Sequence, residues 1–471
     1  MWRLLLLTCS PALLNAQTIA SNPDVLGAQR IFETWMRAQI AYRELPGVAI
    51  GVVYNQELVW AKGFGLADMD KRLPMTPATK FRMASHSKLF TSTAIMQLRD
   101  QGKVRLDDPV TKYLPWFQVK AAQADDPPIT IEELLTHSSG LSREAGSHWS
   151  DYKFPDASEV RAYIEQTQVI YSPQVRWKYS NLALTIAGLV VEAVSGEAYA
   201  TYVQRHIFDP LGMGDSSVDR QVAGLAAGYG RRMPDHSRAR MPFVDAKAMG
   251  AATGITSTVQ DMAKFVSLQF RSGPVSGAQI LSTGGLREMH RVRMLENDWT
   301  RGNAIGFSVT RVKDKVYIGH GGGYPGYTTH TLIQLDDKVG VIALTNGADS
   351  IPAEIAQHLM QIVGVAVAKA AGQSRQPTVA WDPEWSRFAG LYRSAFADIA
   401  VVEVHRQLVA FNPTGEDPER QNRLTPVGNG QFRLEGPTGG TAVGELVRFV
   451  LQPGGKMRMY TGGSYSERVD P

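Results

Sequence analysis

Phe81-Arg82-Met83-Ala84-Ser85-His86-Ser87-Lys88 leads directly into a largely apolar run at residues 89–98. The pattern predicts a buried helix that begins at Ser85. Residues three apart lie on the same face of a helix, so the Ser85 hydroxyl and the Lys88 amine can meet. A serine hydroxyl needs a neighbouring base to become a good nucleophile, and burial lowers the pKa of a lysine until it can act as that base. The stretch therefore predicts a catalytic serine–lysine pair.

The spacing of this pair is not specific by itself. Ser150 and Lys153 repeat it in a loop flanked by Trp and Pro, with no helix after it. Serine is also a common N-cap of helices, which gives Ser85 a purely structural alternative. The catalytic interpretation is favoured because the apolar helix expected after Ser85 would bury Lys88.

A second motif is Tyr179-Ser180-Asn181, the only Tyr-x-Asn in the chain. We expect the pKa of a tyrosine phenol beside a lysine ammonium to be lowered, so that Tyr179 exchanges protons with substrate or water. Asn181 is expected to hold a substrate carbonyl or the lysine. A tyrosine in a turn before a buried helix at residues 181–194 explains the same triplet equally well.

A third motif, His320-Gly321-Gly322-Gly323, follows a strand predicted at residues 315–319. Glycines at a strand edge allow a substrate backbone to approach closely. The backbone N–H of Gly323 can join that of Ser85 as a two-donor oxyanion hole. The alternative is a glycine-rich strand end with a hydrogen-bonded histidine.

Taken together and in this order, the three motifs resemble the signature of the penicillin-recognising serine hydrolases, in the branch of class C β-lactamases, DD-peptidases and esterases. The resemblance extends from about Phe32 to Val367 and includes residues 131–141, 207–213 and 254–263. It implies an α/β fold, in which the site lies between a five-stranded antiparallel sheet and a helical region. The implied roles are catalysis by Ser85, Lys88 and Tyr179, oxyanion stabilisation by Ser85 and Gly323, and substrate binding by Asn181, His320, Gly321 and Gly322.

The third motif departs from the family pattern, because β-lactamases and DD-peptidases usually carry Lys-Thr-Gly there. His320 replaces a permanent cation by a group expected to titrate near neutrality, and the threonine hydroxyl is absent. Both missing groups help to hold a substrate carboxylate. The sequence therefore resembles the D-aminopeptidase and esterase members, and predicts cleavage of an amide or ester bond through an acyl-enzyme on Ser85. D-Ala-D-Ala carboxypeptidase or β-lactamase activity is one alternative, and a non-hydrolytic penicillin-binding sensor is another.

The sequence also predicts a division of the chain into segments. They are a signal peptide at residues 1–16, the serine hydrolase domain at 23–371, a linker at 372–380 and a β domain at 381–471. The positive start Met1-Trp2-Arg3 and the apolar residues 4–14 predict cleavage after Ala16, and hence a periplasmic or secreted protein. In the last segment, short β-prone pieces alternate with turns that contain Gly and Pro. This segment resembles the lipocalin-like β-barrel often appended to such enzymes.

The 471 residues are 44% hydrophobic and 20% charged, which is typical of a globular protein. The formal charge of +4 is small, and no basic run is interleaved with aromatic residues, so nucleic acid is not an expected partner. No stretch after the N-terminal one predicts stable insertion into a membrane. No ligand spacing predicts a metal site, and the mechanism requires no cofactor. The expected partner is a small-molecule or short-peptide substrate, and the oligomeric state stays open.

Overall fold

The structure is a computed structural model. It describes residues 18–146, 148–271, 278–296, 298–312, 315–374, 381–404, 406–413, 422–436 and 442–469. The chain divides into two compact units, Met1–Gly372 and Gln373–Pro471. The predicted signal peptide lies outside the described residues, and so do residues 375–380 of the predicted linker.

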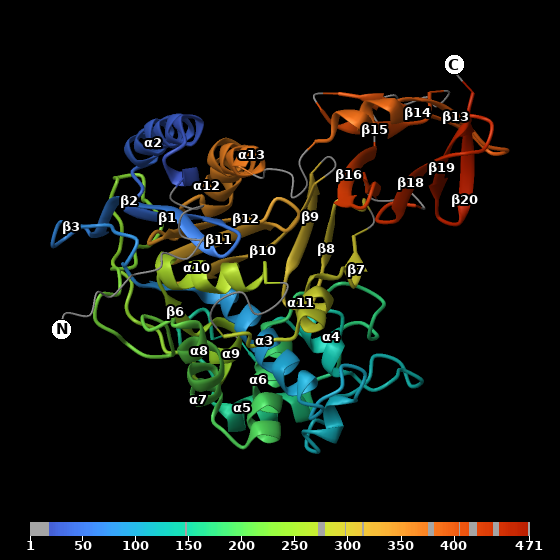
Figure 1. Cartoon of the computed structure of the whole chain (residues 1–471). Helices are drawn as coiled ribbons and strands as arrows, with labels where there is room; N and C mark the ends of the chain where they lie inside the picture. The colour runs from blue at the N-terminus through green and yellow to red at the C-terminus, as the bar shows by residue number, and fades with distance from the viewer. Residues whose placement is uncertain are drawn as a thin grey trace, which may run out of the picture. The chain divides into compact units, whose positions relative to one another are not determined.

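The larger unit is built around an antiparallel β-sheet (Figure 1). Within the described residues its nine strands follow the order β3-β2-β1-β12-β11-β10-β9-β8-β7. Five adjacent strands are long, namely β2 (Glu57–Asp68), β1 (Gly47–Tyr54), β12 (Val339–Thr345), β11 (Tyr327–Gln334) and β10 (Lys315–Tyr324). Shorter strands flank these five, with β3 (Leu73–Pro74) on one side and β9 (Ser308–Val312), β8 (Arg301–Asn303) and β7 (Met294–Leu295) on the other. The predicted α/β fold is confirmed, but the sheet is wider than the five strands expected, because short strands pair onto both edges of the long ones.

Helices cover both faces of this sheet, so its central strands are buried. Every residue of β1 and β12 is buried. Successive side chains of a strand point to opposite faces, and Val48 and Ile50 therefore pack in one apolar cluster while Ala49 and Val53 pack in another. Figure 1 shows the helices on the first face together on one side of the sheet. They are α2 (Pro23–Arg43), α12 (Pro352–Leu359) and α13 (Val365–Ser374), the last two joined by the π-helical turn η5 (Met360–Gly364).

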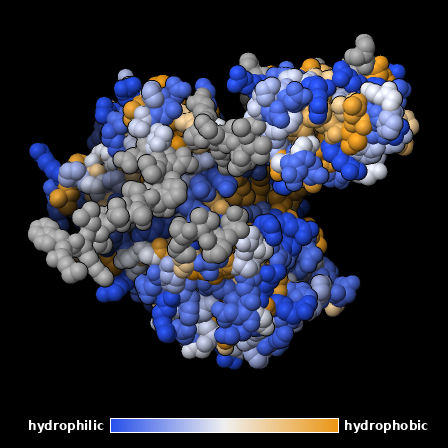
Figure 2. Space-filling view, viewed as in Figure 1, coloured by the Kyte–Doolittle hydropathy of each residue, from blue (hydrophilic) through white to orange (hydrophobic). Residues whose placement is uncertain are grey.

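The helical region on the other face contains the two buried helices that the sequence predicts. α3 (Ser87–Asp100) packs against α6 (Asn181–Ser195), and both are largely buried. The smaller helices are α4 (Ile131–Leu135), α5 (Ala157–Gln166), α7 (Tyr199–Val203), α8 (Asp209–Leu211), α9 (Gly250–Thr253), α10 (Val259–Leu268) and α11 (Thr283–His290), with the turns η2 (Val110–Lys112), η3 (Gln204–Phe208) and η4 (Lys247–Met249). The visible surface of this region is largely hydrophilic (Figure 2). In the described part of the chain no single helix is long and apolar enough to cross a membrane, and α6 with residues 199–211 passes that test only as a pair bent by 79°.

A small three-stranded sheet leads the chain into α3. Its order is β4 (Phe81–Arg82), β6 (Ile255–Ser257) and β5 (Ser217–Val218). The guanidinium of Arg82 is buried and donates to the Asp219 carboxylate (2.8 Å) and to the Gly254 carbonyl (3.0 Å). It also lies 4.8 Å from the ring centroid of Tyr324, at the end of β10. One buried ion pair thus joins three segments directly ahead of Ser85.

The smaller unit is a closed antiparallel β-barrel, which confirms the predicted all-β domain. Its strands among the described residues are β13 (Gly390–Arg393), β14 (Asp398–Glu403), β15 (Leu408–Phe411), β16 (Asn422–Gly428), β17 (Gln431–Glu435), β18 (Leu446–Leu451), β19 (Met457–Thr461) and β20 (Ser464–Arg468), preceded by the 3-10 helix η6 (Pro383–Phe388). β13 pairs with β20, so the barrel leaves no open strand edge. Its core is aromatic, with Phe388 stacked on Phe449 at 4.4 Å and Phe432 beside both.

We expect Arg82→Met to lower the free energy of unfolding by about 3–5 kcal/mol, because it leaves the carboxylate of Asp219 buried without its partner. Chemical denaturation of the purified protein measures this change. Arg105→Met is the control, since Arg105 pairs with Asp107 on the surface, where both side chains are 71% exposed. An equal effect of the two substitutions would contradict the structural role of Arg82.

Candidate active site

Ser85 lies on a tight 3-10 turn, η1 (Ala84–His86), between β4 and α3. The helix was predicted to begin at Ser85, whereas its α-helical part begins at Ser87. Ala84 has a φ of +52°, a left-handed conformation that costs free energy for a residue with a Cβ. Ser87 holds the turn, since its hydroxyl donates to the Ala84 carbonyl (2.7 Å) and accepts from the Ile255 N–H (2.9 Å). The strained turn is therefore fixed by its neighbours.

The side chains of Lys88 and Tyr179 both contact the Ser85 hydroxyl. Lys88 Nζ lies 3.1 Å from Ser85 Oγ, and Tyr179 Oη lies 2.8 Å from the same atom. Lys88 Nζ also donates to the carbonyl of Ala252 in α9 (2.9 Å), which fixes the amine. The three residues predicted to be catalytic are thus neighbours around one oxygen atom.

Burial sets the protonation of these groups. Lys88 is fully buried, and desolvation lowers its pKa to about 7. A substantial share of the Lys88 amine is therefore unprotonated at neutral pH and able to accept a proton. The expectation of a lowered pKa for Tyr179 is wrong. Burial raises the pKa of Tyr179 to about 12, against the opposing effects of the Ser85 hydrogen bond and the Arg143 cation, so the phenol stays protonated.

Two buried histidines support the residues around Ser85. His86 lies within 3.0 Å of two threonine hydroxyls of β11, so its ring links the turn to the sheet. His137 accepts a hydrogen bond from the Ser180 N–H (3.2 Å), and its ring lies 4.4 Å from that of Tyr179. Burial holds the pKa of both histidines well below the usual value. The role of His137 was missed, because a lone histidine in a loop carries no signal of what its ring contacts.

The third motif, residues 320–323, lies inside β10 rather than after it. The strand runs one residue past the motif, because the glycines keep an extended backbone and pair with β11. Gly321 lies opposite His330, and Gly323 lies opposite Thr328. The predicted strand end at Gly319 is therefore wrong, since glycine does not stop a strand that has a partner on its edge.

Gly322 is the point where β10 comes closest to the turn that carries Ser85. A Cβ at this position would lie 2.5 Å from the Met83 carbonyl oxygen and 3.0 Å from the Ala84 Cβ. The absence of a side chain lets the strand pack directly against the turn. Gly323, the predicted second oxyanion donor, is the next residue along this edge and has no atom within 4 Å of its own missing Cβ.

The expectation that His320 titrates near neutrality is wrong. His320 is buried, and burial together with the nearby Lys88 cation lowers its pKa to about 3. Its Nδ1 lies 2.5 Å from the carbonyl oxygen of Gly321, to which it donates. The ring therefore enters the site as a neutral group and does not replace the permanent cation of Lys-Thr-Gly.

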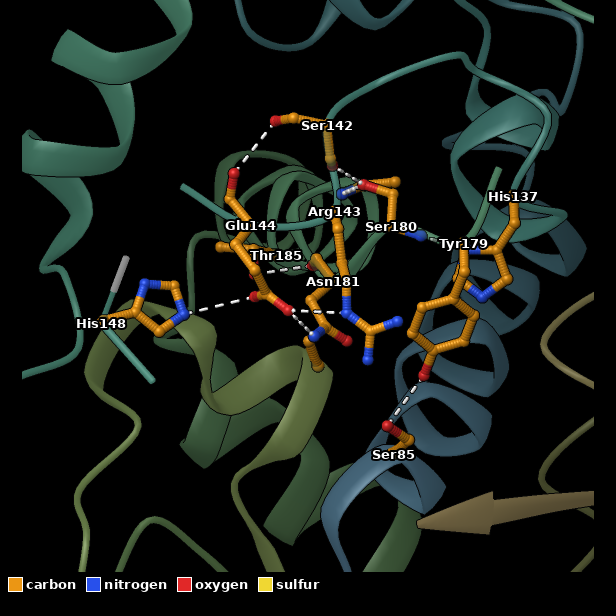
Figure 3. A network of polar contacts seen from close by, with 12 residues as sticks. Ser85, His137, Ser142, Arg143, Glu144, His148, Tyr179, Ser180, Asn181 and Thr185 are labelled. Carbon is orange, nitrogen blue, oxygen red and sulfur yellow. Dashed lines mark hydrogen bonds and ion pairs between the residues drawn. The ribbon is translucent and has the colours of Figure 1, made fainter. Parts of the chain in front are cut away.

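A polar network extends the site beyond the predicted residues (Figure 3). Asn181, the first residue of α6, donates through Nδ2 to Glu144 Oε1 (2.6 Å). Glu144 also accepts from Arg143 Nε (3.2 Å), and its second oxygen lies 3.2 Å from His148 Nε2. Arg143, Glu144 and His148 lie in the segment between α4 and α5, called the rim loop below, and were not among the predicted site residues. Their link to Asn181 was not predicted, because it joins segments far apart in the chain.

The second Ser-x-x-Lys of the chain does not build a comparable site. Lys153 is 84% exposed, and its amine lies 3.9 Å from the carboxylate of Asp151. The Lys153 amine is therefore in contact with solvent, whereas that of Lys88 is enclosed. The structure thus agrees with the preference for Ser85 and Lys88 over this repeat.

Similarity to known proteins identifies the family of the chain. A family model described as "Beta-lactamase" matches residues 32–367. The chain belongs to the beta-lactamase family. This confirms the predicted membership of the penicillin-recognising serine hydrolases. Esterase EstB of Burkholderia gladioli is 31% identical over 240 residues, which are 48% of this chain and 59% of EstB. Protein flp of Staphylococcus aureus (strain MW2) is 29% identical over 187 residues, 40% of this chain and 37% of flp. The chain thus spans less than two thirds of either relative.

Several solved structures share the fold of this chain, at a lower sequence identity than the two relatives above. The octameric penicillin-binding protein homologue from Pyrococcus abyssi is 22% identical, with a TM-score of 0.64 over 93% of this chain and 100% of that one. A D-stereospecific amidohydrolase from Streptomyces sp. is 21% identical, with a TM-score of 0.59 over 72% and 98%. A class C beta lactamase from Rhodobacter sphaeroides is 20% identical, with a TM-score of 0.59 over 73% and 98%. At these identities the likeness establishes the fold alone.

We expect one lysine of the protein to titrate near pH 7, because Lys88 is fully buried. Its side chain is an ammonium below that pH and an amine above it. NMR of protein labelled with ¹³C at the lysine ε-carbon follows the titration, and Lys88→Arg should remove the early-titrating signal. Titration of every lysine only in the usual alkaline range would show that Lys88 is not desolvated.

Proposed function

We propose that the protein is a serine hydrolase that cleaves an amide or ester bond of a small molecule or short peptide through an acyl-enzyme on Ser85. The observation that carries this proposal is the double contact at the Ser85 hydroxyl. One partner, Lys88, has a pKa of about 7 and can accept a proton, and the other, Tyr179, has a pKa of about 12 and can donate one. A base and an acid on one oxygen atom are what nucleophilic acyl transfer requires.

In the acylation step, the Ser85 oxygen attacks the substrate carbonyl carbon while Lys88 takes the hydroxyl proton. The oxyanion of the tetrahedral intermediate receives hydrogen bonds from the backbone N–H groups of Ser85 and Gly323. The bond to the leaving group then breaks, and the leaving group takes the proton of the Tyr179 phenol. The Lys88 ammonium returns its proton to the Tyr179 phenolate, so both groups regain their starting forms with Ser85 esterified.

In the deacylation step, a water molecule attacks the ester carbonyl and gives a proton to the Lys88 amine, which is again unprotonated at this stage. The same two N–H groups stabilise the second oxyanion. The bond from the carbonyl carbon to the Ser85 oxygen breaks, and that oxygen takes the proton back. The products are the free acid and the restored hydroxyl, and Asn181 and His320 position the substrate throughout.

Within this chemistry we propose esterase or D-aminopeptidase action rather than β-lactamase or carboxypeptidase action. His320 is neutral and buried, and Gly321 has no hydroxyl, so residues 320–322 offer neither a cation nor a hydroxyl to a substrate carboxylate. The names of two similar proteins, an esterase and a D-stereospecific amidohydrolase, support this choice. A sensor that stays acylated is the second candidate, because the same Ser85 contacts would support acylation alone.

We expect purified protein to hydrolyse p-nitrophenyl butyrate or D-amino-acid amides faster than nitrocefin. Ser85→Ala should lower this turnover at least about 1,000-fold and abolish labelling by a fluorophosphonate, because it removes the nucleophile. Circular dichroism checks that the variant is folded. Intact-mass measurement over time distinguishes a hydrolase, whose substrate adduct is transient, from a sensor, whose adduct persists. Labelling that survives in Ser85→Ala would overturn the assignment.

We also propose that the protein is exported to the periplasm or secreted. The support is the positive start of the sequence and the apolar residues 4–14 that follow it. We expect the mature protein to begin at Gln17 when the full chain is expressed in a bacterial host. Intact-mass measurement of the periplasmic and cytoplasmic fractions tests this, and full-length chain confined to the cytoplasm would contradict it.

A further inference from the structure

The side chain of Arg143 is a fixed cation at the edge of the site. Its Cζ lies 5.1 Å from the ring centroid of Tyr179, whose hydroxyl contacts Ser85. The Arg143 carbonyl accepts hydrogen bonds from the N–H groups of Asn181 (2.8 Å) and Leu182 (3.2 Å). The backbone of the rim loop is thereby fastened to the start of α6. The cation consequently has a defined position relative to the reacting hydroxyl.

The guanidinium is also oriented, although the side chain is 63% exposed. Its Nε donates to Glu144 Oε1, and Figure 3 shows the planar group drawn between the Asn181 amide and the Tyr179 ring. Glu144 itself is only 12% exposed and is shared with Asn181 and His148. Within the described part of the chain, Nη1 and Nη2 of Arg143 make no hydrogen bond. The outer fork of a held guanidinium is thus open to a ligand.

An open guanidinium fork fits one ligand chemistry especially well. Two parallel N–H donors match the two oxygens of a carboxylate, and the group stays charged at every working pH. Because the ring of Tyr179 and the carboxylate of Glu144 already hold Arg143, little side-chain freedom remains to be lost on binding. The Glu144 charge does not compete strongly for the fork, since its oxygens face Nε, Asn181 and His148.

We propose that Arg143 binds a carboxylate of the substrate, so that the site selects anionic esters or amides. This inference rests on the proposed hydrolysis at Ser85 and names the substrate class. The proposed carboxylate contact lies on the rim loop beside Tyr179. It does not lie on β10, where this chain lacks Lys-Thr-Gly. The carboxylate can belong either to the acyl part of the substrate or to its leaving group.

The experiment compares matched anionic and neutral substrates in two arms. In the acyl arm, the p-nitrophenyl monoester of adipate is compared with p-nitrophenyl hexanoate. In the leaving-group arm, 4-butanoyloxybenzoate is compared with its methyl ester. Rates are corrected for spontaneous hydrolysis, and the readout in each arm is the ratio of kcat/KM for the anionic substrate to that for the neutral one.

We expect Arg143→Gln to lower this ratio about 10- to 100-fold in one arm, which is the usual effect of losing hydrogen bonds to a charged group. Arg143→Lys should lose less, because it keeps the charge without the fork. The ratio in the wild type should also fall with added salt. Arg161→Gln is the matched control, since Arg161 is also exposed, donates through Nε to Glu165 (3.1 Å) and lies 5.6 Å from the ring of Trp116. We expect no change of the ratio in that variant.

Two outcomes would overturn the inference and leave the proposed function intact. One is a ratio that Arg143→Gln changes in neither arm. The other is an equal loss on anionic and neutral substrates, which would mean that Arg143 acts only by holding Tyr179. Failure of the wild type to turn over any of the four esters, together with absent labelling of Ser85, would overturn the proposed function and this inference with it.

Discussion

The amine of Lys88 has been taken out of water, and the chemistry of the site depends on that single desolvation. A buried ammonium is costly, so the amine needs hydrogen-bond partners and a lowered pKa. The partners are the carbonyl of Ala252 and the hydroxyl of Ser85. The same surroundings that lower the pKa of Lys88 raise that of Tyr179 and keep His320 neutral. Burial in one enclosed environment therefore makes Lys88 a base, Tyr179 an acid and His320 an uncharged imidazole.

The fold keeps this environment closed by packing three separate elements around the turn at Ser85. Strand β10 reaches it through Gly322, the small sheet reaches it through Arg82 and Ile255, and α6 brings Tyr179 at its start. A left-handed Ala84 persists only where its surroundings over-determine the backbone. The tight packing around Ala84 is thus what keeps its backbone in the strained conformation.

Charge is distributed unevenly around the reacting hydroxyl. In the motif of β10, residues 320–323, the group that could be charged is His320, and it is buried and neutral. The permanent cation lies instead on the rim loop, where Arg143 is held by Glu144 and the ring of Tyr179. A cation held by other side chains selects ligands by position as well as by sign, because it cannot follow a badly placed anion. The rim loop, rather than β10, is therefore the element that distinguishes anionic from neutral substrates.

The sequence by itself determined the family, the α/β class and the local elements that carry the motifs. The spacing of Ser85 and Lys88 and that of Tyr179 and Asn181 made these residues candidates. Their order along the chain, followed by residues 320–323, selected them. The nearly uninterrupted apolar run of β1, whose residues are all buried, likewise has the pattern of a central strand.

Only the tertiary structure decided what those residues are next to. The pKa values of Tyr179 and His320 departed from expectation because burial arises from segments distant in the chain, which no local pattern encodes. The extension of β10 through its glycines depended on the pairing with β11. The link of Asn181 to Glu144 and Arg143 depended on how the rim loop folds onto α6. Covalent spacing sets which side chains are available, whereas desolvation and long-range contacts set what they can do.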